Sequence, residues 1–491
     1  MHSSIHKNLS GSEPVSVPLG LISLLYKKGA AQFGHLVSLA PFGRVKNLFA
    51  LGLVSVLMAN HGLSRSSTLE DTLKASKNVD KALASAEFNK RAAFENIDIA
   101  RSRLLPQLNL QGFKQRLNQT TTQNTSLGPQ ANEFRGESYQ YQLSLRQSLF
   151  RPRDWSGLSL GQQQALYGEL KLESAKSDLY NRAAGAWIDV LAALSNRDLY
   201  QEAIKTIGES AKQERLRFEK GDGTKDSMIE AQAQLTQAHA MLKDAELNLE
   251  AKLQTHQLLT GSDQREWRNK KLPSEDRVNF EETQKSAFLE RIKTLSPEIL
   301  AAKAVEGVNS ARAAQALYDH FPTLDMVASA TRAQNDTTNT LGYTYQNQQV
   351  GLQLNVPLYA GGGIDANRRQ AVASLDASVA DRESLVLRVE TQFENDWATQ
   401  AGLLERTKAA RALVFSALEQ KKAALAGVAK GVRTWSDVSN AELLLARRSS
   451  DLVAIESNLY KIQSRILSLL PIQDDDWEKW IKSMDTASRS F

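Results

Sequence analysis

The sequence predicts a mainly α-helical protein with a small β part, built from two structural repeats. Two stretches of more than sixty residues lack proline and are rich in good helix formers, and four shorter stretches alternate apolar with polar residues. These elements come in the same order in both halves of the chain. Each repeat is therefore expected to run short helix, strand, strand, very long helix, tight turn and shorter helix.

A leader is expected over residues 1–63. The run from Leu48 to Ala59 is apolar and follows two basic residues. It is about the length of a signal-peptide core, whereas a helix that spans a bilayer needs about 20 residues. A buried helix is the alternative. Cleavage is expected after Ala59 to Leu63, and residues 1–43 are interpreted as an extension from an upstream start codon.

Composition excludes several classes of function. The chain has 491 residues and a formal net charge of +5, but residues 1–60 hold five bases and one acid, so the remaining body is nearly neutral. Nucleic-acid binding usually needs a basic face and is not expected. The absence of cysteine excludes disulfides, thiolate metal sites and cysteine nucleophiles. No segment after the leader is apolar enough for a transmembrane helix.

Four landmarks recur in order along the two halves, which indicates an internal duplication. They are the end of the second strand (Phe150, Tyr359), the turn glycine (Gly221, Gly431), the terminating residue (Gly261, Pro471) and the start of the first strand (Pro106, Pro322). The first three pairs lie 209 or 210 residues apart and the fourth lies 216 apart, so the loop between the strands is expected to be seven residues longer in the first half. The predicted boundaries are 64–261 for the first repeat, 262–296 for a linker, 297–471 for the second repeat and 472–491 for a C-terminal tail.

The four strands are predicted from alternation with period two. Their apolar positions are Leu108 and Leu110; Tyr139, Tyr141, Leu143 and Leu145; Leu324, Met326, Ala328 and Ala330; and Val350, Leu352, Leu354, Val356 and Leu358. Each run is close to the ~9–11 residues of a tilted membrane strand. The opposite face is polar and suits a wet lumen, with candidate lumen positions at Gln140, Gln142, Arg146, Gln349, Gln353 and Asn355. A soluble sheet with one wet face is the alternative.

The two long helices are predicted over Gly157–Glu219 and Ile364–Ala429. At 1.5 Å per residue each would be roughly 95–100 Å long, which is typical of coiled-coil packing. Abundant alanine would allow neighbouring helices to approach closely.

Four membrane strands cannot form a closed barrel alone, because a barrel needs about eight or more and an open edge is not tolerated in lipid. Several chains must therefore pool their strands. Two chains would give eight strands and a filled interior, whereas three would give twelve and a water-filled bore. The residues alone do not choose between them.

The order of elements and several motifs resemble the TolC family of outer-membrane efflux and secretion channels. Val350–Ala371 resembles the family's strand, glycine turn and long helix, while Arg217–Leu235 and Gly427–Ala446 resemble its two hairpin tips. The resemblance covers roughly Thr68 to Pro471. It implies a homotrimer with a twelve-stranded β-barrel, a periplasmic α-helical barrel, and an equatorial collar formed by residues 262–296 and 472–491.

The resemblance also implies a function. The protein is expected in the bacterial outer membrane, in contact with its lipid, as the passive exit duct of a tripartite efflux pump or a type I secretion system. Its partners would be a periplasmic adaptor and an inner-membrane ABC or proton-driven transporter. The alternative is a structural coiled-coil protein of the periplasm without a pore. No catalytic residues, cofactor or metal site are expected, since the sequence has no His-Glu-x-x-His and no nucleophile elbow.

A periplasmic gate is implied at the hairpin tips. Asp437 resembles an acid that narrows the family's closed entrance, and Arg433 resembles the arginine that links neighbouring hairpins. The local alternative is a capping box, because a threonine precedes this acid by three residues. Asn440 and Ser227 replace acids found in some members, with Asp226 beside the latter. The acidic ring and the link through arginine are therefore expected to be weaker or arranged differently here.

The tips also carry glycines that would allow a tight reversal. Gly221, Gly223 and Gly431 are predicted to supply a positive φ. By resemblance these tips, together with Trp435, are where an adaptor docks. The run Gly361–Gly363 lacks the spacing of a phosphate-binding loop and is interpreted as a flexible turn from strand to helix.

Overall fold

The computed structural model describes residues 68–261, 267, 270–273, 280–337 and 340–488. Contacts divide the chain into Met1–Asn60 and His61–Phe491, and all described residues lie in the second unit. The expected signal segment, Leu48 to Ala59, lies outside the described residues. Among the described residues, every helix is too short or too polar to cross a membrane.

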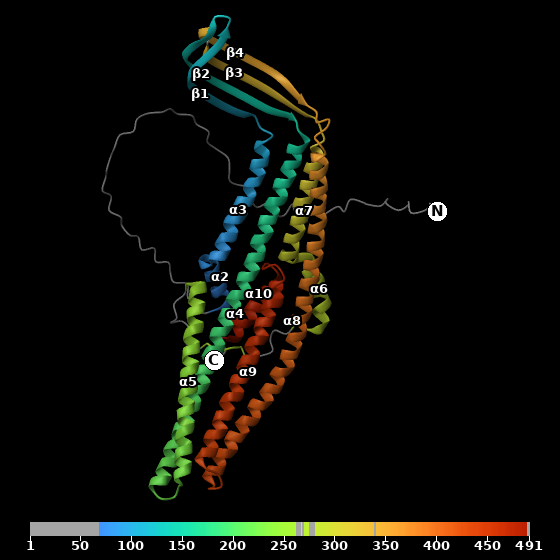
Figure 1. The fold of residues 1–491 in the computed structure, drawn as a ribbon. Coiled ribbons are helices and arrows are strands. Elements are labelled where there is room, and N and C mark those ends of the chain that lie inside the picture. Colours follow the sequence, from blue (N-terminus) through green and yellow to red (C-terminus); the bar gives the residue numbers. More distant parts are fainter. Residues whose placement is uncertain (1–67, 262–266, 268–269, 274–279, 338–339, 489–491) are drawn as a thin grey trace, which may run out of the picture. The chain divides into compact units, whose positions relative to one another are not determined.

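The two repeats have the same order of elements, as expected (Figure 1). The first contains α2 (Leu69–Val79), α3 (Lys81–Ser102), β1 (Gln107–Thr125), β2 (Gly128–Phe150), α4 (Pro152–Glu219) and α5 (Lys225–Thr260). The second contains α7 (Pro297–Tyr318), β3 (Thr323–Thr337), β4 (Thr340–Asn355), α8 (Gly363–Ala429) and α9 (Trp435–Ser468). A 3-10 turn (Glu282–Gln284) and α6 (Lys285–Leu295) precede it in the segment expected as a linker, and α10 (Asp475–Ser488) follows it. Both long helices are confirmed, and α4 begins five residues earlier than expected.

The expected short helix of the first repeat is in fact two helices, and the expected linker ends in a helix, α6, directly before the short helix α7 of the second repeat. The break falls at Asp80 in the first repeat and at Ser296, 216 residues further on, in the second. Asp80 caps α3, because its carboxylate accepts a bond from the Leu83 amide at 2.6 Å. Ser296 precedes Pro297, whose missing N–H fits only the first turn of a helix. Two different residues thus produce the same break.

The four strands form one antiparallel sheet in the order β1-β2-β3-β4. They contain 19, 23, 15 and 16 residues, so they are longer than the expected 9–11. The first hairpin has no longer loop. Its extra residues lengthen β1 and β2, which meet at a tight turn before Gly128, where φ is 104°. β4 ends at Asn355, short of the predicted Leu358, since Pro357 has no N–H for the ladder.

The register fixes two distinct faces, because cross-strand partners point to the same side. The apolar face carries Leu108, Leu145, Ala328 and Val350 in one row, and Leu110, Leu143 and Ala330 in the next. The polar face carries the residues that alternate with them. Among the described residues, the outer edges of β1 and β4 have no strand beside them.

The helices pack closely through small residues. A Cβ on Gly161 would lie 2.6 Å from the Asn96 carbonyl oxygen, and one on Gly168 would lie 2.5 Å from the Ala93 Cβ, so both glycines bring α4 against α3. Ala183 and Ala184 are fully buried. Around the middle of the long helices, a core of large side chains joins α6 and α10 to them. It includes Trp187, Phe393, Trp397, Trp477 and Trp480.

Candidate functional site: the helical tips and the polar face of the sheet

Two turns end the long helices at the far end from the sheet. α4 starts directly after β2 and runs for 68 residues, so at 1.5 Å per residue the first turn lies about 100 Å along the helix. We call Lys220–Thr224 the first tip and Lys430–Thr434 the second tip (Figure 1). They are the candidate gate and docking sites.

Two of the three tip glycines adopt the expected left-handed conformation. Gly221 has a φ of 80° and Gly431 a φ of 70°. Gly223 does not have a positive φ, which corrects the prediction. It is required by close approach instead, because a Cβ there would lie 2.9 Å from the Phe218 backbone nitrogen.

The second tip contains the expected capping box. The Asp437 amide donates to Thr434 Oγ1 at 3.2 Å, and the Thr434 amide donates to Asp437 Oδ2 at 2.8 Å. The carboxylate of Asp437 nevertheless stays exposed. The stem of Arg433 lies over Gly427, where an added Cβ would be 2.8 Å from the arginine Cγ. The local role of Asp437 is confirmed, and it leaves the charge accessible to another molecule.

The first tip is capped by hydroxyls. The Ser227 amide donates to Thr224 Oγ1 at 3.2 Å, and the two side-chain oxygens are 2.8 Å apart. Ser227 is therefore engaged in its own helix end. Asp226, beside it, is exposed in the first turn of α5.

The helical hairpin of α4 and α5 and that of α8 and α9 contact each other close to the tips. Glu214 of α4 is 1% exposed and accepts a bond from the Trp435 amide at 2.9 Å. Gln234 of α5 donates to Asn440 Oδ1 at 2.9 Å and to Ser436 Oγ at 3.2 Å. Asn440, predicted as a gate residue, thus takes part in this contact between hairpins.

Sequence reasoning missed Glu214 and Gln234. A signal for Glu214 exists, because it continues the buried stripe Ala203, Ile207, Ala211 at helical spacing. An acid in line with apolar positions indicates a buried charge with a partner.

The polar face of the sheet holds all six predicted lumen positions. Gln140, Gln142 and Arg146 of β2 share this face with Gln349, Gln353 and Asn355 of β4, because the register aligns even positions of β2 with odd positions of β3 and β4.

A buried carboxylate lies at the base of this face and was not predicted. Asp325 is 2% exposed. It accepts a bond from Arg146 Nη2 at 2.7 Å and two from Arg151, from Nε and Nη2, each at 2.8 Å. One acid thus ties together β2, β3 and the turn into α4. Nothing in the sequence signalled it, since Asp325 and Arg151 are 174 residues apart.

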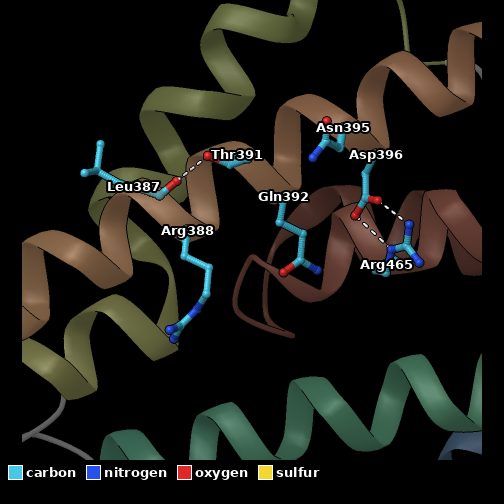
Figure 2. Close-up of a pocket in the computed structure, with 7 residues that line it drawn as sticks. All are labelled: Leu387, Arg388, Thr391, Gln392, Asn395, Asp396 and Arg465. Carbon is cyan, nitrogen blue, oxygen red and sulfur yellow. Dashed lines mark hydrogen bonds and ion pairs between the residues drawn. The ribbon is translucent and has the colours of Figure 1, made fainter.

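The groove shown in Figure 2 lies along α8 and has a volume of about 590 Å³. Its charged end is occupied by an ion pair within the chain. Arg465 of α9 donates Nε to Asp396 Oδ2 at 2.8 Å, and this bond raises the pKa of Arg465. The described residues contain no cluster of His, Cys, Asp or Glu able to hold a metal ion.

Comparison with known proteins identifies the relatives of this chain. The family model described as outer membrane efflux protein matches residues 73–262 and 288–470. The alkaline protease secretion protein AprF of Pseudomonas aeruginosa is 26% identical over 72% of this chain and 74% of its own length. The outer membrane protein TolC of Escherichia coli is 25% identical over 87% of this chain and 86% of its own length.

Solved structures share the fold. A crystal structure of CusC aligns with a TM-score of 0.69 at 16% identity, covering 82% of this chain and 92% of that one. The open-state MtrE channel of Neisseria gonorrhoeae aligns with a TM-score of 0.66 at 18% identity, covering 82% and 88%.

Proposed function

The chain belongs to the outer membrane efflux protein family, and from this membership we infer that it forms the exit duct of a tripartite export machine. It is an outer-membrane efflux or secretion channel with a periplasmic helical part, and it is not an enzyme. The alternative of a periplasmic coiled-coil protein without a pore is therefore set aside. Subunit number, gate residues and partners are our proposals.

One observation carries the proposal that several copies assemble, and we propose a homotrimer because two copies would close a barrel with a filled interior. The sheet has an apolar face suited to lipid, yet both outer edges of its four strands lack a partner within the described chain. Backbone groups at such edges must be satisfied in a membrane. Three copies joined edge to edge, β4 to β1, would form a closed barrel of twelve strands, wide enough for an aqueous bore.

In that barrel the polar face would line the bore. Five of the six predicted lumen positions are neutral amides. The sixth, Arg146, shares the carboxylate of Asp325 with Arg151, which also lies 3.9 Å from the carboxylate of Asp154. Such a wall offers hydrogen bonds without a strong field, which suits a conduit that must not retain its cargo.

We place the gate at the second tip, on Asp437 and Arg433. The exposed carboxylate of Asp437 would form a ring of three around the axis, and Arg433 would reach the neighbouring hairpin. The contacts of Glu214 with Trp435 and of Gln234 with Asn440 would hold the two hairpins of one subunit together, so opening would separate whole subunits at their tips.

We further propose that the tips bind the hairpin of a periplasmic adaptor, around Gly221, Gly223, Gly431 and Trp435, and that an ABC or proton-driven transporter supplies the energy. The names of AprF and PrtF connect those proteins with protease secretion. The family description refers to efflux. Both classes of cargo therefore remain candidates.

Single-channel recording in planar bilayers tests the gate. The double variant R433A/D437A is expected to raise the conductance several-fold, because it removes the charges that narrow the entrance. The matched control E202A/K205A removes one acid and one base from an exposed pair of α4 and should not change it. Unchanged conductance of the tip variant would reject the gate assignment.

The trimer is tested separately by the mass of the purified protein in detergent. We expect three chains per particle. A monomer that conducts no ions would contradict the proposed assembly as well as the gate.

A further inference from the structure

The charges of the sheet are divided unequally between its faces. In the half of the sheet near the hairpin turns, every charged side chain that the structure describes lies on the apolar face. These residues are Lys114, Arg116, Glu133, Arg135, Glu137 and Arg332. The polar face carries only Arg146 and Asp325 among its described charges, and both lie at the opposite end, near the helices.

From the helices towards the hairpin turns, the residues of the apolar face change in the same order as the layers of a membrane. The row of Leu108 is entirely apolar, and the row of Leu110 is apolar except for Gln348 of β4. The next row towards the turns pairs Tyr141 with Arg332, and the one after it pairs Tyr139 with Lys114 and Gln334. The two tyrosine rings lie 5.8 Å apart between their centroids. Aromatic residues typically mark the boundary between the acyl chains and the polar headgroups.

A groove lies on this boundary. It has a volume of about 520 Å³ and is lined by Lys114, Glu137, Tyr139, Tyr141, Arg332 and Gln334. Lys114 Nζ is 2.8 Å from Glu137 Oε2, but both side chains are more than half exposed, so this ion pair is weak and easily exchanged. Arg332 is exposed on the adjacent row.

The described side chains of this surface carry a net positive charge. Among the side chains that the structure describes, four bases and two acids lie on the apolar face from the tyrosine rows to the hairpin turns. Clusters of Lys and Arg beside a membrane surface attract anionic headgroups, and phosphate oxygens accept charge-assisted hydrogen bonds from both side chains. Because the helical part is periplasmic, the hairpin turns face outward, so the lipid at this level belongs to the outer leaflet.

We propose that this groove binds a phosphate group of the phosphorylated glycolipid that forms the outer leaflet of the outer membrane. Lys114 and Arg332 would contact the phosphate, and the two tyrosines would lie against the sugar and the start of the acyl chains. The site rests on the membrane orientation that belongs to the proposed function. It extends that function, because it makes the surrounding lipid a specific ligand of the channel.

Binding of purified bisphosphorylated lipid A to the full-length channel in detergent tests the proposal, with bound lipid per chain measured by native mass spectrometry. The variant K114Q/R332Q is expected to bind about 25-fold more weakly, since each base near an anionic surface contributes about a fivefold change in affinity. E137Q is expected to bind more tightly, because it removes an acid that competes with phosphate for Lys114.

Three controls isolate the site. K205Q/K212Q removes two exposed bases from α4 and should leave lipid binding unchanged. Lipid A without phosphates should bind wild type and K114Q/R332Q equally. Millimolar inorganic phosphate should not displace the lipid; complete displacement would mean that the groove recognises free phosphate, which would overturn the proposal.

Equal affinity of wild type and K114Q/R332Q for lipid A would also overturn it. The same samples are assayed for trimer mass and ion conductance. Normal values for both would show that the lipid site has failed while the channel stands, whereas loss of both would indicate failure of the proposed function.

Discussion

The two repeats turn from strand to helix in different ways. Between β2 and α4, Arg151 directs two nitrogens to the buried Asp325, at 2.8 Å each, and Pro152 starts the helix. Between β4 and α8, Gly361 and Gly362 have φ values of 61° and 78°, and a Cβ on either would meet no atom within 4 Å. One turn is fixed by ion pairs, and the other is permitted by glycine.

The difference matters because Asp325 belongs to the other repeat. The first turn is held by a residue of β3, so the orientation of α4 depends on contacts between repeats. At the second turn, the Gly363 amide donates to the Ala360 oxygen at 3.0 Å, within the backbone of the turn itself. A duplicated fold thus keeps the spacing of its elements while the interactions that stabilise each copy diverge.

A second contrast lies near the ends of α5 and α9. His256, near the end of the first repeat, and Trp267, just beyond it, are buried with ring centroids 4.9 Å apart. The residues 210 positions further on are Ile466 and Trp477, which are buried as well. Only the first repeat therefore has a titratable group at this position.

The largest effect is expected at the first turn. Asp325→Ala leaves two arginines without their buried partner and should lower the free energy of unfolding by about 3 kcal/mol. Gly362→Ala, the matched change at the second turn, should cost only about 1 kcal/mol, for a left-handed φ in open space. Urea denaturation of the purified protein measures both, and equal losses would contradict the comparison.

A smaller effect is expected from pH. Burial lowers the pKa of His256 to about 4, below the value of about 6.5 in the unfolded chain. The free energy of unfolding is therefore highest above pH 6.5, where His256 is neutral in both states. It decreases as the pH falls from 6.5 towards 4, because in this range the unfolded chain binds a proton at His256 and the folded chain does not. Between pH 7 and pH 5 the free energy of unfolding should fall by about 2 kcal/mol from this residue alone.

The variant H256I gives the first repeat the residue of the second, and should flatten this pH dependence. The exposed His239 offers a control on the same helix, since H239Q should leave the dependence as it is. A wild-type stability that stays constant between pH 7 and pH 5 would be incompatible with the role of His256.

These contrasts explain what the sequence could predict. The long helices end at Glu219 and Ala429 as expected, because proline-free runs rich in good helix formers stop at a glycine turn. The polar face was predicted because alternation of apolar and polar residues is visible within the sequence of each strand. Both signals are local and repeat along the sequence.

The remaining features depend on distant or unpatterned residues. The bond of Arg151 to Asp325 joins residues whose pairing exists only once the sheet has formed. The strands extend beyond their apolar part because Gln, Thr and Asn are compatible with both faces in water, so alternation gives no boundary there. Gly223 was assigned a positive φ on its residue type, although close packing is the reason for glycine.

The smallest effect is expected at the tips, where Thr224 with Ser227 corresponds to Thr434 with Asp437, 210 residues further on. Only the second pair forms a full capping box. Ser227→Asp should give the first tip the same box and stabilise the protein by about 0.5 kcal/mol, while Asp437→Ser should remove a similar amount. Thermal unfolding of both variants measures this. A destabilising S227D would mean that repulsion from the adjacent Asp226 outweighs the new cap, and that the first tip carries serine because a second carboxylate is not tolerated there.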